Sequence, residues 1–207
     1  EGNHPPQTAE VGGSVEVHRR VYGYAYKTEL SSASLTKDME RGLISDVAVS
    51  FAWINGKGNL TGFDPMSSSI QQFVTYAHSK GVSVHLAVAL FDSNVTKKVL
   101  VSGKEKMTAQ IAAAIEAADM DAASLDFEAI PHTVQYRNLY SDFSEMLGAA
   151  LHAKGLKLYH AVSQMPESNL DPVRVSNASD GLLIMGYAYA GSWSGYGWPN
   201  APYSTGG

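Results

Sequence analysis

The stretch that decides the fold is Asp121-Ala122-Ala123-Ser124-Leu125-Asp126-Phe127-Glu128. Its polar and apolar residues alternate, and alternate side chains of a β-strand point to opposite faces. We therefore predict a buried strand over residues 122–128 that carries Ser124, Asp126 and Glu128 on one face. Carboxyl groups on a buried face are costly unless they form hydrogen bonds, share a proton or take part in chemistry.

The surroundings of this strand favour a functional role. The pattern Asp-x-Glu alone also occurs on solvated edge strands, where it has no function. Here an Ala-rich helical stretch at residues 107–118 comes before it, and Pro131 is expected to terminate the strand. If the sheet is parallel, the carboxyl end of the strand is where catalytic groups gather.

Strands and helices alternate along the rest of the chain. Further short apolar segments, typical of buried parallel strands, lie at residues 21–26, 46–53, 82–90, 157–162 and 181–187. Helical patterns lie at residues 35–42, 67–80, 104–118 and 136–154. Gly81 and Gly155 each close a helix and lead directly into a strand. This order predicts an α/β fold with a parallel sheet.

Two parallel architectures compete, a doubly wound open sheet and a TIM-type (β/α)8 barrel. The open sheet usually has a Gly-rich phosphate loop after its first strand, but residues 22–26 are Tyr-Gly-Tyr-Ala-Tyr. In strand 82–90, small residues with His85 alternate with large apolar ones, as expected where a barrel interior borders a cleft. We therefore predict the barrel, with about six βα units present in this chain.

Composition limits the class of protein. The chain has 207 residues, of which 44% are hydrophobic and 17% charged, so we expect a single, partial barrel domain over residues 1–207. Residues 1–18 are expected to form an extended N-terminal segment. A net charge of −5 without a basic cluster argues against nucleic acid as a partner.

No membrane association is expected, because no apolar run approaches the roughly 20 residues that span a bilayer. Residues 1–7 have neither the basic nor the apolar region of a signal peptide, so we expect none in this chain.

The sequence gives little support for a metal site or a cofactor site. The chain has no cysteine, which excludes thiolate nucleophiles and Cys-based zinc sites. Its seven histidines show no His-x-x-x-His spacing, although His85 and His160 lie on predicted strands and are candidates to face one interior. There is neither a nucleotide-binding loop nor a Gly-x-Ser-x-Gly nucleophile motif. We predict no metal and no cofactor.

The sequence resembles glycoside hydrolase family 18, the chitinases and related N-acetylglucosaminidases. That family carries Asp-Gly-x-Asp-x-Asp-x-Glu on its fourth barrel strand, and residues 121–128 match the first Asp and the last two acids. Leu125-Asp126-Phe127-Glu128 before Ile130-Pro131 is most similar to the bacterial, spore-hydrolase-like branch. In chain order, further matches to the family lie at residues 21–24, 51–53, 56–60 and 185–187.

The resemblance implies a role for each matching residue. Glu128 would be the general acid and base, and Asp126 would orient the 2-acetamido group whose carbonyl oxygen attacks the anomeric carbon, a substrate-assisted route. Tyr187 would hydrogen-bond the acetamido carbonyl. The remaining substrate-binding candidates are Ser124, Tyr24, Trp53 and Met185. For Tyr24 and Trp53, a place in the hydrophobic core is an equally good interpretation.

The implied substrate is a polysaccharide of β-1,4-linked N-acetylglucosamine, of chitin or peptidoglycan type. The implied location is extracellular or associated with the cell wall.

Several departures from the family pattern keep alternatives open. Ser124 replaces the middle Asp, Ala122 the Gly, and Ala188 an Asp that follows Tyr187 in the family. A complete barrel has eight strands and about 250 residues, whereas the last predicted strand here is the sixth. We expect a clipped form, a reduced fold or a second segment or chain that completes the barrel.

The competing function is a catalytically impaired sugar-binding domain, and a weaker one is an inhibitor of other hydrolases. Relatives that only bind sugar commonly lose the acid, so the presence of Glu128 favours the enzyme.

Overall fold

A computed structural model describes residues 20–163 and 169–187. Within these residues, six strands form one parallel sheet in the order β1-β2-β4-β5-β6-β7, so each strand lies beside the next parallel strand in the chain. They are β1 (Tyr22–Tyr26), β2 (Asp46–Ile54), β4 (Ser83–Leu90), β5 (Ala122–Phe127), β6 (Lys157–Ser163) and β7 (Gly181–Met185). The two-residue strand β3 (Leu60–Thr61) pairs antiparallel with β2. This sequential parallel order confirms the prediction of a partial (β/α) barrel.

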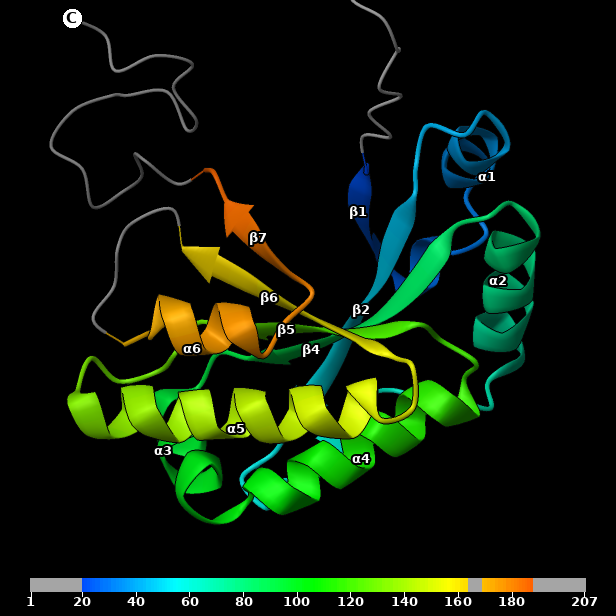
Figure 1. Cartoon of the computed structure of the whole chain (residues 1–207). Coiled ribbons are helices and arrows are strands. Elements are labelled where there is room, and N and C mark those ends of the chain that lie inside the picture. Colours follow the sequence, from blue (N-terminus) through cyan, green and yellow to red (C-terminus); the bar gives the residue numbers. More distant parts are fainter. Residues whose placement is uncertain (1–19, 164–168, 188–207) are drawn as a thin grey trace, which may run out of the picture.

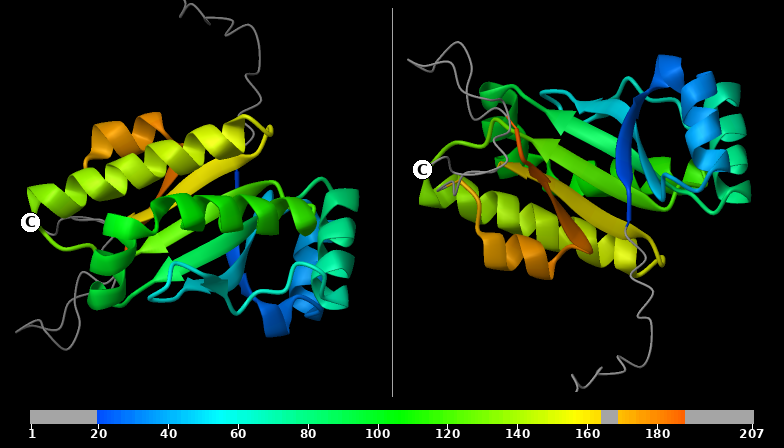
Figure 2. Two further views of the ribbon diagram at one scale, coloured as in Figure 1. Left: turned by 90° about the horizontal axis from the view of Figure 1, so that it is seen from below. Right: turned by 90° about the horizontal axis from the view of Figure 1, so that it is seen from above.

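The helices cover one face of the curved sheet. They are α1 (Ala33–Glu40), α2 (Ser68–Ser79), α3 (Ser93–Ser102), α4 (Lys104–Ala117), α5 (Val134–His152) and α6 (Pro172–Asn177), with a 3-10 turn η1 (Lys27–Glu29). In Figure 1, α3 to α6 lie under the sheet and α1 and α2 at its side. Seen from above in Figure 2, the opposite face carries no helix from the described part of the chain. That open face is the interior of the partial barrel.

The alternation in β4 separates the two faces as predicted. Val84, Leu86, Val88 and Leu90 pack into the hydrophobic core between sheet and helices. The small residues of the other face, Ala87 and Ala89, are buried but do not belong to this core. The barrel interior is therefore lined by small and polar side chains at this strand.

Two helices begin earlier than the hydrophobic pattern predicts, because a capping side chain sets each helix start. The side chain of Ser32 accepts a hydrogen bond from the backbone N–H of Leu35, and Thr133 does the same for Tyr136, so α1 and α5 begin two residues earlier than predicted. Gly81 and Gly155 adopt φ values of 72° and 74°, which confirms their helix-closing role.

Four short elements were missing from the sequence interpretation: η1, β3, α3 and α6. The signal for α3 was present, because Asp92 caps its first turn and Val95, Val99 and Leu100 follow at helical spacing. Its content of Val and Thr, which are weak helix formers, concealed it. For α6 the signal was Asp171 followed by Pro172 at the first helical position.

Two strand starts share one arrangement. Asp121, just before β5, accepts hydrogen bonds from the backbone N–H of Val84 in β4 and from His78 of α2. Asp180, just before β7, accepts them from the backbone N–H of Leu158 in β6 and from the ring of His152. Each carboxylate thus joins a strand to the neighbouring strand and to the end of the helix that precedes that neighbour.

Several expectations lie outside the described residues, namely the extended segment at residues 1–18 and the consequence of Ala188. Among residues 20–163 and 169–187, no helix is both long and apolar enough to cross a bilayer.

Candidate active site

The candidate active site lies where β5 ends. Ser124 and Asp126 are buried on the interior face of β5, and Glu128 is exposed directly after it. The prediction that Pro131 ends the strand was wrong, since β5 ends at Phe127. Its pairing with β4 reaches Phe127, while its pairing with β6 stops at Leu125, so the chain beyond Phe127 has no ladder to continue.

Asp126 and Glu128 interact as a pair. Burial, the negative charge of Glu128 and a hydrogen bond with Glu128 raise the pKa of Asp126 to about 6. Oδ1 of Asp126 is buried and makes no hydrogen bond within the described part of the chain. The pair can therefore hold one proton in weakly acidic solution and still offer an acceptor atom to a ligand.

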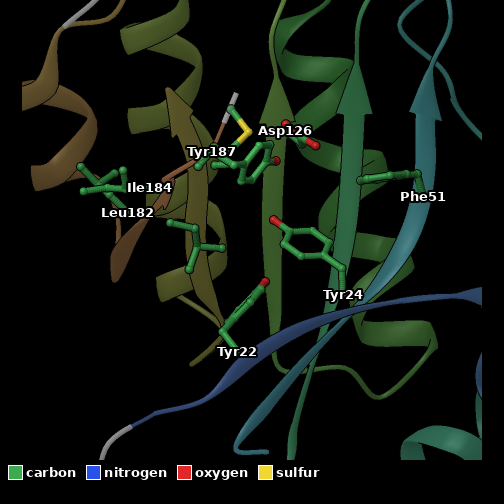
Figure 3. A pocket seen from close by; sticks show the side chains of 10 residues that line it. Tyr22, Tyr24, Phe51, Asp126, Leu182, Ile184 and Tyr187 are labelled. Atoms are coloured by element: carbon green, nitrogen blue, oxygen red, sulfur yellow. The ribbon is translucent and has the colours of Figure 1, made fainter. Parts of the chain in front are cut away.

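A cavity of about 550 Å³ opens beside Asp126. Figure 3 shows the hydroxyl ends of Tyr22 and Tyr24 pointing into it from β1, with Tyr187 on the far side beside Asp126. Other lining residues come from β2, β6 and β7: Phe51, Ala161, Leu182, Leu183, Ile184 and Met185. The cavity thus combines an acid with aromatic and aliphatic walls, as small-ligand sites commonly do.

Among the predicted site residues, the structure brings Asp126, Tyr24, Tyr187 and Met185 to this one cavity. Burial and the negative charges of Asp126 and Glu128 raise the pKa of Tyr187. The hydroxyls of Tyr24 and Ser124 lie 3.2 Å apart.

Trp53 does not line the cavity. Its ring lies 5.6 Å from that of Phe51 and 5.4 Å from that of Phe91, centroid to centroid, and its side chain is exposed. Neither Tyr24 nor Trp53 is a buried core residue, because they are 45% and 41% exposed.

Sequence reasoning missed Tyr22 and Phe51 as cavity residues. Tyr22 could have been found, since it precedes Tyr24 by two positions and so shares its face of β1. Phe51 could not, because its position depends on an irregularity in β2. The register with β4 shifts between Val49 and Ala52.

The expectation that His85 and His160 could face one interior was wrong. His85 faces the barrel interior, where its ring stacks on Tyr159 at 4.8 Å. His160 faces the helices and its Nδ1 lies 2.8 Å from the hydroxyl of Tyr140 on α5. Register explains this, because His160 pairs with Leu125, whose side chain points to the core. No group of three metal-binding side chains occurs within residues 20–163 and 169–187.

Comparison with solved structures gives a consistent result. The C-terminal domain of a putative chitinase from Desulfitobacterium hafniense superposes with a TM-score of 0.77 at 22% identity, over 89% of this chain and 59% of that one. A GH18 chitinase from Flavobacterium johnsoniae superposes with a TM-score of 0.65 at 18% identity, over 84% of this chain and 56% of that one. The described chain has the chitinase fold. The spore cortex-lytic enzyme SleL of Bacillus cereus superposes with a TM-score of 0.67 at 15% identity, over 82% of this chain and 42% of that one.

This chain spans little more than half the length of the chitinase structures it matches. No protein-family model and no curated protein matches the sequence. At these low identities the comparison establishes the chitinase fold alone.

Proposed function

We propose that this chain is part of a glycoside hydrolase of family 18 that cleaves β-1,4-linked N-acetylglucosamine polymers of chitin or peptidoglycan type. The observation that carries the proposal is the Asp126–Glu128 pair, placed at the carboxyl end of β5 beside an aromatic cavity in a chitinase fold. Carboxyl ends of barrel strands are where the catalytic groups of such barrels lie.

Each residue has a role in the proposed reaction. Glu128 protonates the glycosidic oxygen while the carbonyl oxygen of the 2-acetamido group attacks the anomeric carbon, so the leaving sugar departs with the proton. Water then opens the cyclic intermediate and gives its proton to Glu128, with net retention of configuration. Oδ1 of Asp126 accepts the acetamido N–H, and the phenol of Tyr187 donates to the acetamido carbonyl.

The proposal extends to what surrounds the site. A further segment of the protein or a second chain completes the barrel next to β1 and β7. The protein acts outside the cell or at the cell wall, where such polymers occur.

Turnover of a chromogenic N-acetylchitooligosaccharide tests the proposal. Glu128→Gln removes the transferable proton and keeps the shape, so we expect kcat to fall by roughly a thousandfold. Glu105→Gln is the matched control, because Glu105 is exposed in the first turn of α4, and it should leave kcat unchanged. Equal turnover by wild type and Glu128→Gln would refute the role of Glu128.

The second candidate function is a sugar-binding domain without turnover. Two features favour it: Ser124 in place of a carboxylate, and a sheet that ends at β1 and β7 within the described residues. Calorimetry with the same oligosaccharide separates the two: a binding domain binds equally well with Glu128→Gln and shows no turnover in the wild type.

A further inference from the structure

The side chain of Arg20 reaches across the barrel interior at the amino ends of the strands. Arg20 lies just before β1, and its Nη1 donates a hydrogen bond of 2.6 Å to the hydroxyl of Tyr159 on β6. The guanidinium carbon also lies 5.3 Å from the centroid of the Tyr159 ring. Because β2, β4 and β5 separate β1 from β6 in the sheet, this contact does not follow the strand ladder. It joins two distant walls of the partial barrel.

A buried carboxylate holds Arg20 in this position. Asp46, the first residue of β2, is 1% exposed, and its Oδ2 accepts hydrogen bonds from Nε of Arg20 at 3.0 Å and from the hydroxyl of Ser45 at 2.7 Å. Its Oδ1 accepts a hydrogen bond from Nη2 of Arg20. Burial alone would raise the pKa of Asp46, but the hydrogen bonds from Arg20 and Ser45 hold it below its ordinary value. All three guanidinium nitrogens are therefore used, two by an ionised Asp46 and one by Tyr159.

Tyr159 is fixed from the other strands. Its ring is buried and stacks on the ring of His85 in β4, with the centroids 4.8 Å apart. Nε2 of His85 lies 3.1 Å from the hydroxyl of Ser83 and 3.2 Å from Oδ1 of Asp46. A Cβ added to Gly181 of β7 would lie 3.0 Å from the Tyr159 ring, so this ring packs closely against the backbone of β7. The contact with Arg20 thus links β1 to a side chain that β4 and β7 hold in place.

The two strands that this contact joins are also walls of the cavity. Tyr22 and Tyr24 of β1 line it, and so does Ala161 of β6, which lies two residues after Tyr159 and shares its face. Figure 3 shows the rings of Tyr22 and Tyr24 on one side of the cavity and Leu182 on the other. Within the described residues no strand joins β7 to β1, so backbone hydrogen bonds between these two strands do not set the spacing of the walls.

We propose that Arg20 is a positioning residue that sets the width of the cavity by joining β1 to β6 through Tyr159. Asp46 orients the guanidinium, the guanidinium holds the Tyr159 hydroxyl, and the cavity walls continue upward from these two points. The consequence for a bound sugar rests on the proposed function, whereas the contact itself is a property of the folded chain.

The first test measures the spacing of the walls by double electron–electron resonance between two nitroxide labels. The chain has no cysteine, so Thr28→Cys in η1 after β1 and Val173→Cys in α6 before β7 take the labels specifically. Both positions are exposed, and neither lines the cavity. Tyr159→Phe removes the hydroxyl that binds Arg20 and keeps the ring stacked on His85. We expect the distance between the labels to lengthen and its distribution to broaden.

Tyr76→Phe is the matched control, because it removes a tyrosine hydroxyl that binds Glu40, away from the cavity, and it should leave the distribution unchanged. If Tyr159→Phe does not fold, Arg20→Lys decides in its place. A lysine keeps the charge beside Asp46 but lacks the planar fork that reaches both partners, so it should widen the spacing as well. A distribution equal to that of the wild type would overturn the proposal, whether or not the chain has turnover.

Sugar affinity gives a second readout. The cavity walls contact a bound sugar while the carboxyl pair lies on another strand, so Tyr159→Phe should raise KM for the chromogenic oligosaccharide roughly tenfold with kcat nearly unchanged. Loss of folded protein has the opposite signature, a lower kcat at unchanged KM, and that result would refute the positioning role. A wild type that neither binds nor cleaves the sugar counts against the proposed function, while the label distances still decide the role of Arg20.

Discussion

At the scale of single residues, the candidate site keeps a carboxyl group where its charge is poorly solvated. Asp126 is 7% exposed, and the neighbouring charge of Glu128 adds to the effect of burial. Such an arrangement makes the folded state less stable than a neutral side chain would, and it is typical of catalytic sites. Because the pKa of Asp126 is about 6, the pair retains a proton below about pH 6.

The first residue-scale prediction concerns stability against pH. Asp126 binds its proton more tightly in the folded than in the unfolded chain, so its contribution to stability is complete below about pH 4. That contribution is lost as pH rises through about 6. The shift of about two pH units corresponds to at most about 3 kcal/mol.

Asp126→Asn removes this dependence and should be more stable than wild type at pH 7 by roughly 1–3 kcal/mol, but not at pH 4. Urea unfolding of both proteins at pH 4, 5, 6 and 7 measures this difference in the free energy of unfolding. Glu105→Gln is the control for the change in net charge. Parallel curves for wild type and Asp126→Asn would show that Asp126 has an ordinary pKa.

At the scale of elements, α5 and α6 approach each other closely at one glycine. A Cβ added to Gly148 in α5 would overlap the carbonyl oxygen of Ala178, at the end of α6. Glycine lowers the stability of a helix interior by about 1 kcal/mol relative to alanine. Here the close approach of backbone to backbone requires it.

Gly148→Ala should therefore destabilise the protein by roughly 1–3 kcal/mol, the usual effect of overpacking, although helix propensity alone predicts a gain. Gly56→Ala is the control, since no atom lies within 4 Å of its added Cβ, and its effect should stay within about 0.5 kcal/mol. Chemical denaturation gives both values. A more stable Gly148→Ala would mean that α6 can move away from α5.

At the scale of the whole molecule, the described sheet ends in two strands with an unpaired side, β1 and β7. Ile184 of β7 is 69% exposed and Val21, just before β1, is 49% exposed. Exposed apolar edge strands pair with other chains unless charges oppose it.

We expect the 207-residue chain to self-associate through these edges. Ile184→Lys should raise the monomer fraction in light scattering, because a charge on an edge strand opposes pairing. Val173→Lys, a change on α6 at a residue that is 66% exposed, is the matched control and should have little effect. If both variants associate as wild type does, the edges are not the contact.

The sequence alone determined the strand order, the helix-closing glycines and the carboxyl pair. These features depend on local chemistry: alternation in β4 and β5, the special backbone at Gly81 and Gly155, and a two-residue spacing in one strand. For Tyr24 the sequence left a place at the site and a place in the core equally open, and the structure places it at the cavity. The local rules were less reliable at helix starts, where capping by Ser32 and Thr133 overrides the hydrophobic period.

Only the tertiary structure decided which distant residues meet. The contact of Tyr24 with Ser124 spans one hundred residues, and that of His85 with Asp46 depends on the register between β2 and β4. The same applies to the separation of His85 from His160, since a shift of one residue in a strand turns every side chain to the other face. Alternation within a segment can be seen in the sequence, but register between segments is set by packing of the whole sheet.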